Sequence, residues 1–425
     1  MAEIRAFKGM RYNSDAIRDI SKVVSPPYDI ISPEDRVYYH KLHPQNFVRL
    51  ILGEEFGTDN AVNNRFTRAK EYLDEWQEAD VLTEESEPTI YLYEQQFERD
   101  GQIKIIHGFT CLIKLHDYAD NVILPHENTL ARPKSALAEL IRATNANLDC
   151  VYGLYADEHF VMQDVITKAM SQSAIIDVKD KDGVRHILWP INESDDLSII
   201  TDFIKEKQIA IADGHHRYET ALAYKKETRL NKKIDAGEID QDFAIMTIVN
   251  VFEPDLTVLP THRVVNNLSS DLVGGLLEKL SVDFKITESK KESLEKDMAE
   301  TNGIGLYFKD MAFVLDAKVD FYDRLEGCDA ARKLELNVLH KIILEPMLGI
   351  DREKLLNQTN VTYTRSFNEA ISLVDEGKAQ LSFLLNEIAV KSILDIAAAG
   401  EKMPQKATYF YPKLLSGMVF RVMES

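Results

Sequence analysis

The densest group of side chains able to perform chemistry lies at residues 213–220, which read DGHHRYET. Gly214 permits a sharp backbone turn at the end of a strand. The residues after it would open a helix, whose first N–H groups and positive dipole end attract an anion. His215, His216 and Arg217 add donors and charge at the same helix end. We therefore predict that this turn binds the phosphates of a nucleotide.

Two other interpretations of the turn stay open from the residues alone. Asp213 could cap the helix start, with the histidines exposed or hydrogen-bonded, which would make the segment purely structural. His215 and His216 could instead ligate zinc, although adjacent histidines at a helix start point apart. The chain contains no HExxH or comparable spacing, so we assign no metal ligands.

A second polar segment, LPHENTLARPK, covers residues 124–134. Glu127 beside His126 is a candidate general base or metal ligand, and Arg132 and Lys134 on a proline-containing loop could hold an anion. Loops with this mixture of side chains often carry function. The alternative is a structural hydrogen-bond network.

Three shorter segments could contribute to the same site. At residues 25–29 two prolines stiffen a loop that presents Tyr28 and Asp29, although this loop could equally be a turn packed by its ring. His262 and Arg263 follow Thr261 at a strand end, where the alternative is a surface turn. In residues 405–413 we expect the aromatic rings to pack, with Lys406 and Thr408 within reach of a ligand.

The elements that would position these residues alternate between strands and helices. Residues 209–212, the Asp213-Gly214 turn, a helix through Lys225 and a strand at 244–252 form the best-defined unit. Hairpins are predicted for 89–97 with 103–115 around Asp100-Gly101, and for 175–178 with 186–191. Helices are predicted after the N-cap Ser32, at 64–78 and at 134–145.

The pattern changes beyond about residue 266, so we place a domain boundary there. Residues 290–300 indicate a solvated helix, and 381–399 are apolar at helical spacing, which indicates another helix. We predict an α+β fold with mixed sheets and interleaved helices. Residues 1–265 would form the catalytic region with inserted β-hairpins, and 266–425 a C-terminal α/β domain that contributes to the same site.

Composition excludes several classes of protein. The 425 residues are 45% hydrophobic, enough for more than one core, and their formal charge of −20 disfavours nucleic acid or an anionic membrane as partner. No apolar stretch approaches the roughly 20 residues that a bilayer requires, and the first residues lack an apolar signal core. The three cysteines form no CxxC pair. We expect a cytoplasmic protein, with a homo-oligomer as an open possibility.

Seven segments, in order along nearly the whole chain, resemble the bacterial and archaeal family known as domain of unknown function 1015. They are SPPYDIIS at 25–32, HPQNFVRLIL at 43–52, LPHENTLARPK at 124–134, LIRATNANLDCVYGLY at 140–155, IADGHHRYETAL at 211–222, LPTHRVV at 259–265 and MPQKATYFYPKLLSG at 403–417.

The DGHHR turn is also similar to the phosphate-binding turn of the ParB/sulfiredoxin-like superfamily, which implies a nucleotide-binding core of that type. The superfamily includes partition proteins, sulfiredoxin and kinases of free serine. Sulfiredoxin chemistry needs a cysteine where this chain has His215, and a partition protein needs a DNA-binding half, which the acidic composition opposes. The kinase is the activity that the resemblance leaves.

The resulting hypothesis is an ATP-dependent kinase that phosphorylates free L-serine, or a similar hydroxyl-bearing metabolite, with ATP or ADP and Mg²⁺ as cofactors. Gly214, His215, His216, Arg217, His262 and Arg263 would bind the nucleotide. Glu127 would be the base, assisted by His126, with Asp213 and Glu219 as alternatives. Arg132 and Lys134 would hold the substrate carboxylate, and Tyr28 with Asp29 its amine.

Two alternatives stay open for the protein as a whole. One is a nucleotide-binding regulatory protein or NTPase without phosphoryl transfer. The other is a metal-dependent hydrolase that uses His126, Glu127, His215, His216 and His262.

Overall fold

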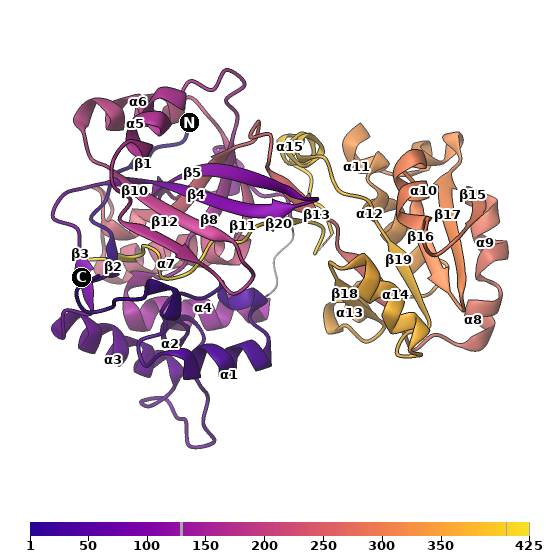
Figure 1. Cartoon of the computed structure of the whole chain (residues 1–425), viewed down its shortest axis with the longest axis horizontal. Helices are drawn as coiled ribbons and strands as arrows, with labels where there is room; N and C mark the ends of the chain where they lie inside the picture. The colour runs from indigo at the N-terminus through magenta and orange to yellow at the C-terminus, as the bar shows by residue number, and fades with distance from the viewer. Residues whose placement is uncertain (128–130, 405, 425) are drawn as a thin grey trace. The chain divides into compact units, whose positions relative to one another are not determined.

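The computed structural model describes residues 1–127, 131–404 and 406–424, without the side chains of 131–133 and 319–320. The chain divides into two compact units (Figure 1). The first unit comprises Met1–Pro125, Thr129–Leu256 and Pro412–Ser425, and the second comprises His126–Asn128 and Thr257–Tyr411. Both units are built from mixed strands and helices, which confirms the predicted α+β class.

A mixed sheet of nine described strands forms the centre of the first unit. Only the pairs β6–β11 and β8–β12 are parallel. β12 is mostly apolar and is buried along its whole length, as expected for a strand covered on both faces. The strand order is β6(Ile123–Leu124), β11(Ile209–Asp213), β8(Val151–Tyr155), β12(Phe243–Asn250), β5(Gln102–Lys114), β4(Ile90–Arg99), β10(Arg185–Ile191) and β9(Ile176–Lys179), and β1(Ile4–Arg5) also pairs with β5.

Both predicted hairpins are confirmed. β4 and β5 pair up to Arg99 and Gln102, and the two residues between them, Asp100 and Gly101, have φ of 54° and 73°. Positive φ at both positions matches the right-handed twist of the strands. β9 and β10 pair in the same antiparallel manner.

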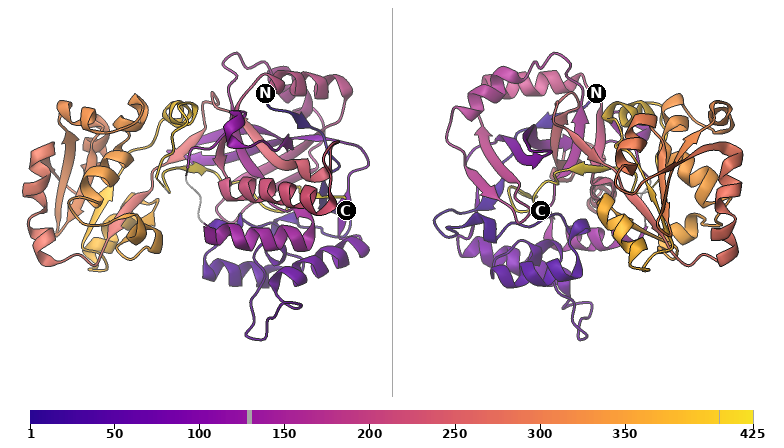
Figure 2. Two further views of the ribbon diagram at one scale, coloured as in Figure 1. Left: turned by 180° about the vertical axis from the view of Figure 1, so that it is seen from behind. Right: turned by 45° about the vertical axis from the view of Figure 1, so that its right-hand side comes forward.

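Helices cover the sheet of the first unit on both sides. Figures 1 and 2 show α5(Gln163–Met170) and α6(Ser194–Lys205) on one side, and α7(His215–Lys232), α4(Ala131–Thr144) and α3(Arg65–Glu78) on the other. The helix predicted at 64–78 is confirmed as α3, whose Ala69, Leu73 and Trp76 form a buried apolar stripe. Its N-cap Asn64 accepts hydrogen bonds from the N–H groups of Phe66 and Thr67. α1(Pro33–Leu42) and α2(Val48–Ile51) lie on the same side of the sheet as α3 (Figure 1). Ser32 caps α1 as predicted.

The C-terminal segment belongs to the first unit. β21(Arg421–Val422) pairs with β7(Ala146–Asn147), while Phe420 and Ser416 form backbone bridges to Met10 and Ser25. The short strands β2(Met10–Tyr12) and β3(Leu82–Glu84) form an antiparallel pair. The C-terminal segment, roughly 200 positions from β11 along the chain, is therefore part of the same folded unit as β11.

The second unit contains a fully antiparallel sheet of six described strands. Its order is β15(Phe284–Ser289), β17(Met311–Ala317), β16(Ile304–Phe308), β19(Leu381–Leu384), β14(His262–Val265) and β18(Val361–Thr364). β13(Thr257–Leu259) pairs separately with β20(Tyr409–Tyr411). The helices are α8(Ser270–Gly274), α9(Leu276–Asp283), α10(Leu294–Thr301), α11(Asp329–Lys333), α12(Glu335–Val338), α13(Arg352–Asn357), α14(Phe367–Asp375) and α15(Val390–Ala398), with a π-helical turn at Leu339–Leu344.

Two features of the second unit differ from the sequence-based expectations. The helix predicted at 381–399 is wrong, because this stretch divides into β19 and α15. A short apolar run satisfies a buried strand and a buried helix equally, so periodicity alone did not separate them. The units also divide after Leu256 rather than after Val265, since β14 lies within the second sheet between β18 and β19.

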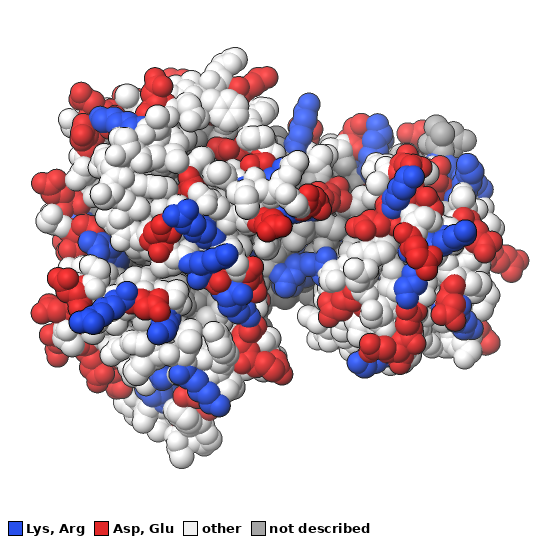
Figure 3. Space-filling model, viewed as in Figure 1, with Lys and Arg blue, Asp and Glu red and all other residues white. Residues whose placement is uncertain are grey.

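Acidic and basic side chains are interspersed over the visible face of both units (Figure 3). Within the described residues, no helix combines the length and apolar character needed to cross a membrane.

We expect Gly153→Ala to destabilise the protein, because this glycine holds β8 close to its neighbours. A Cβ there would lie 2.7 Å from Ile209 Cγ2 and 2.7 Å from Met246 Sδ. Overpacking of this kind costs about 1–3 kcal/mol. Urea unfolding would measure the loss, with the exposed Gly57→Ala as control, since a Cβ at Gly57 meets nothing within 4 Å. Equal stabilities of the two variants would contradict this account of β8.

Candidate functional site

The turn between β11 and α7 has the predicted strand, turn and helix order. β11 ends at Asp213, and Gly214 takes a left-handed conformation with φ of 87°. A Cβ on Gly214 would lie 2.9 Å from Arg217 Nε, so glycine is required both by the backbone and by the space. α7 begins at His215 and continues to Lys232, beyond the predicted end at Lys225.

The Asp213 carboxylate does not cap α7. The N-cap position of α7 is Gly214, which has no side chain that could cap the helix. Asp213 Oδ2 instead accepts from Arg217 Nη2 at 2.9 Å and lies 3.3 Å from Lys413 Nζ. Burial raises the pKa of Asp213, but the charges of Lys413 and Arg217 outweigh it and hold the pKa well below its ordinary value. Asp213 is therefore ionised and compensated, which opposes the structural-cap interpretation.

Arg217 is held by the fold at both ends of its guanidinium. Nη1 donates to the carbonyl oxygen of Cys150 while Nη2 binds Asp213, and the side chain is only 8% exposed. Burial lowers its pKa, but Asp213, Asp29 and Asp149 raise it above the ordinary value. These contacts make Arg217 a positioning residue for the turn. Its predicted contact with a nucleotide phosphate stays a prediction.

Asp149 is a member of this cluster that the sequence analysis missed. Its Oδ1 accepts a hydrogen bond from Ser416 Oγ, and partial burial raises its pKa to about 6 against the opposing charge of Arg217. Asp149 lies within the segment 140–155 that carries the family resemblance. A lone aspartate before a strand gives no chemical signal of its own.

Lys413 is the second residue without an assigned role. It lies at the end of the segment 405–413, where only Lys406 and Thr408 were considered as ligand contacts. Its side chain is 8% exposed because the C-terminal segment brings it to Asp213. No local pattern relates two residues so far apart in sequence.

The loop with Tyr28 and Asp29 lies in the same unit. Ser25 and Ser416 exchange backbone hydrogen bonds of 3.2 and 2.8 Å, which fixes the loop beside the C-terminal segment. Burial and the neighbouring Asp29 raise the pKa of Tyr28 above its ordinary value, while Arg217 lowers it. Tyr28 is thus within electrostatic reach of Arg217, and Asp29 is exposed.

A small cavity of about 50 Å³ adjoins the cluster, between side chains of α4 and α7. Asp149 and Arg217 line it together with Asn147 and Thr220. The atoms Asn147 Oδ1 and Thr220 Oγ1 are buried there without a hydrogen-bond partner among the described residues. A polar group entering this cavity would satisfy both atoms.

The residues predicted to hold a substrate carboxylate lie on α4. Lys134 Nζ forms an ion pair of 2.8 Å with Glu219 Oε2 on α7, which joins the two helices. Arg132 lies in the first turn of α4, and its side chain is outside the described part of the structure. Both assignments stay predictions.

His126 and Glu127 belong to the second unit. His126 is fully buried, and its Nε2 lies 2.9 Å from Thr408 Oγ1. Glu127 Oε1 accepts a hydrogen bond of 2.9 Å from the N–H of Lys406. His126 and Glu127 are therefore in contact with Thr408 and Lys406, the two residues of the segment 405–413 that were predicted to reach a ligand.

His262 and Arg263 are buried in the same unit. His262 Nδ1 accepts from the N–H of Leu385 at 3.2 Å, and burial lowers the His262 pKa to about 4. Arg263 donates to the carbonyl oxygens of Thr261 and Lys406, and burial lowers its pKa to about 10. These contacts exclude the surface-turn interpretation. Nucleotide binding by the pair stays a prediction.

The described residues contain no group of three or more His, Cys, Asp or Glu arranged to hold a metal ion.

We expect Asp149→Asn to change how stability depends on pH. The raised pKa means that the folded protein binds a proton more tightly than the unfolded chain, so ionisation of Asp149 destabilises the fold as pH rises from about 4 to 7. Relative to the parent, the variant should gain about 2–3 kcal/mol across this interval, at roughly 1.4 kcal/mol per pKa unit. Urea unfolding at several pH values tests this. The exposed Asp202→Asn serves as control, and parallel profiles for all three proteins would contradict the prediction.

Distant similarities to solved structures extend over most of the chain. A free serine kinase in complex with AMP is 13% identical, with 71% of this chain and 86% of that chain covered and a TM-score of 0.37. A conserved hypothetical protein from Pyrococcus furiosus is 14% identical, with 72% and 92% covered and a TM-score of 0.36. C-terminally truncated SbnI from Staphylococcus aureus is 12% identical, with 72% and 85% covered and a TM-score of 0.37.

Sequence comparison gives the family. No curated protein matches the chain. The family model described as "Protein of unknown function (DUF1015)" matches residues 4–337, well over half of the chain, and this confirms the predicted resemblance. The protein belongs to the DUF1015 family.

Proposed function

We propose that this protein is a kinase that transfers a phosphoryl group from ATP or ADP to the hydroxyl of a small metabolite, with free L-serine as the leading substrate. The observation that carries the proposal is the turn from Asp213 to Arg217. It presents a left-handed glycine at the N-cap of an 18-residue helix, where the backbone carries no side chain between an incoming ligand and the first turn. A helix start of this kind is suited to bind phosphate.

The charge around the turn supports an anionic ligand. Lys413 and Arg217 neutralise Asp213, so the carboxylate does not repel an incoming phosphate. His215 and His216 add their rings at the first two positions of α7. Mg²⁺ would enter bound to the phosphate oxygens of the nucleotide, as this ion usually does.

In the proposed reaction the substrate hydroxyl oxygen attacks the terminal phosphorus of the nucleotide. The new P–O bond forms as the bond to the leaving phosphate oxygen breaks, giving ADP from ATP or AMP from ADP. Glu127 accepts the hydroxyl proton. The protein's contribution is to position the groups and to neutralise charge on the moving phosphoryl group.

Substrate recognition would use the remaining polar residues. Arg132 and Lys134 are proposed to bind the carboxylate, and Tyr28 with Asp29 the amine. Asp149 joins the amine-binding group in this proposal, because its carboxylate lies in the cluster with Arg217.

A direct assay tests the function. The protein is incubated with ATP or ADP, Mg²⁺ and pooled amino acids, and mass spectrometry looks for a phosphorylated amino acid together with the spent nucleotide. O-phosphoserine is the expected product. Nucleotide binding without any phosphorylated product would instead identify a regulatory nucleotide-binding protein.

We expect Glu127→Gln to keep nucleotide affinity and to lose turnover by about 100-fold or more, the usual contribution of a general base. Glutamine can still accept the hydrogen bond from the Lys406 N–H, so the local fold should persist. Steady-state rates and nucleotide titrations measure the two quantities. Glu158→Gln, at an exposed position, is the matched control. Full turnover by the Glu127 variant would show that another group is the base.

We expect His216→Ala to weaken nucleotide binding by about tenfold, since a hydrogen bond to a charged group contributes roughly 1.5–3 kcal/mol. His216 is partly buried at the second position of α7. Isothermal titration with ADP measures the change, and His159→Ala, at an exposed position, provides the comparison. Unchanged affinity in the His216 variant would remove this side chain from the phosphate site.

A further inference from the structure

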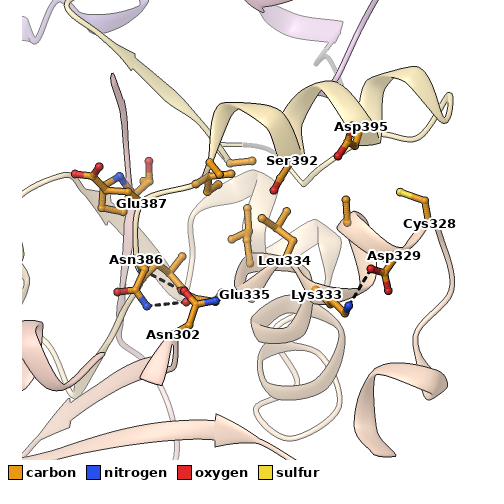
Figure 4. Close-up of a pocket in the computed structure, with 18 residues that line it drawn as sticks. Asn302, Cys328, Asp329, Lys333, Leu334, Glu335, Asn386, Glu387, Ser392 and Asp395 are labelled. Atoms are coloured by element: carbon orange, nitrogen blue, oxygen red, sulfur yellow. Dashed lines mark hydrogen bonds and ion pairs between the residues drawn. The ribbon is translucent and has the colours of Figure 1, made fainter. Parts of the chain in front are cut away.

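The second unit contains a cavity of about 550 Å³ that the proposed kinase reaction does not use. Its walls come from the α11–α12 region, the segment after β19 and the first turn of α15 (Figure 4). Leu334, Leu336, Leu385 and Ile388 supply much of its apolar surface. Cavities that bind small molecules have this size and combine an apolar lining with a few polar groups.

One carboxylate is fixed at this cavity. Glu335 Oε1 accepts from Asn386 Nδ2 at 2.6 Å, and Oε2 accepts from the N–H of Asn386 at 3.0 Å. Asn386 Nδ2 also donates to the Gly303 carbonyl oxygen at 3.1 Å, which holds the amide in place. Figure 4 shows the Glu335 and Asn386 side chains joined on one side of the cavity. The Glu335 carboxylate is therefore preorganised.

The charge of Glu335 has no cationic partner within the described residues. No Lys, Arg or His among them forms an ion pair with it, and burial raises its pKa to about 7. The lysine of the cavity lining, Lys333, is instead bonded to Asp329 Oδ2 at 2.9 Å. A cation that entered the cavity would pair with this carboxylate and favour its ionised form, which both hydrogen bonds from Asn386 already orient.

The other charged groups of the lining favour the same sign of ligand. Asp395 is exposed and lines the cavity, and Asp329 is already paired with Lys333, so among the described lining residues the carboxylates of Glu335 and Asp395 are not balanced by a lysine or arginine. These two charges disfavour an anion. Ser392 projects from α15 toward Leu334 and adds a hydroxyl oxygen (Figure 4).

We propose that this cavity binds a small organic cation, a primary amine on an apolar body. The ammonium group contacts the Glu335 carboxylate, and the hydrocarbon part packs against Leu334, Leu336, Leu385 and Ile388. An organic cation fits better than a metal ion, because the described residues contain no cluster of three or more metal-ligating side chains and because leucine and isoleucine side chains line the cavity beside Glu335.

Isothermal titration of the full-length protein with three ligands of one shape tests the proposal. Phenethylamine carries the positive charge, 2-phenylethanol is neutral and 3-phenylpropionate is negative. We expect the amine to bind at least tenfold more tightly than the alcohol and the carboxylate not to bind. Equal affinities for the amine and the alcohol, or no binding of the amine at millimolar concentration, would overturn the proposal.

Two variants locate the binding site. Glu335→Gln keeps an acceptor for Asn386 but removes the charge, so it should lose amine affinity by tenfold or more, whereas Glu326→Gln, at an exposed position of the same unit, should not. Ser392→Lys should place an ammonium group in the cavity and block the added amine. Amine affinity that survives in both cavity variants would overturn the assignment to Glu335. Neither variant alters a residue of the proposed kinase reaction, so nucleotide binding serves as the check on folding.

Discussion

The organisation of the first unit depends on compensating one negative charge, that of Asp213, at the end of a buried strand. β11 carries this carboxylate to a place where water cannot solvate it fully, and a buried charge without a partner would be costly. Arg217, in the first turn of α7, supplies one cation. Lys413, in the C-terminal segment, supplies the other. The same C-terminal segment gives Ser416 to Asp149 and pairs β21 with β7. The contacts that complete the ion cluster therefore also hold the C-terminal segment in the first unit. The N-cap of α7 is Gly214, which has no side chain.

Local signals in the sequence predicted the parts of this arrangement that are local in space. The N-cap Ser32, the stripe on α3, the positive-φ pair at Asp100-Gly101 and the β11–α7 turn each follow from residues within one turn or one hairpin of each other. Lys413 and Asp149 were missed because their roles arise from contacts with residues far away in the chain, 267 positions for Asp149 and Ser416, and such pairs leave no periodic pattern. The error at 381–399 has the opposite origin: the local apolar pattern was correct, but burial in the second sheet decided between strand and helix.

The candidate residues fall into two groups with different electrostatic surroundings. The turn, Tyr28 and Asp149 share a cluster in which Arg217 and Lys413 face several carboxylates, and burial raises the pKa of Asp149 to about 6 against the charge of Arg217. In the second unit Arg263 is buried against backbone carbonyls, whereas Glu335 is a carboxylate without a described cation. The phosphate site that we propose in the first unit and the amine site that we propose in the second therefore have different electrostatic surroundings.

The proposed kinase reaction requires that the start of α7 binds the phosphates of a nucleotide. Hydrogen exchange of the full-length protein, measured by mass spectrometry with and without ADP, tests it most directly. We predict that ADP slows exchange at the backbone amides of residues 213–220 more than elsewhere, because phosphate oxygens accept their hydrogen bonds. Unchanged exchange in this segment under conditions where titration shows ADP to be bound would contradict the claim.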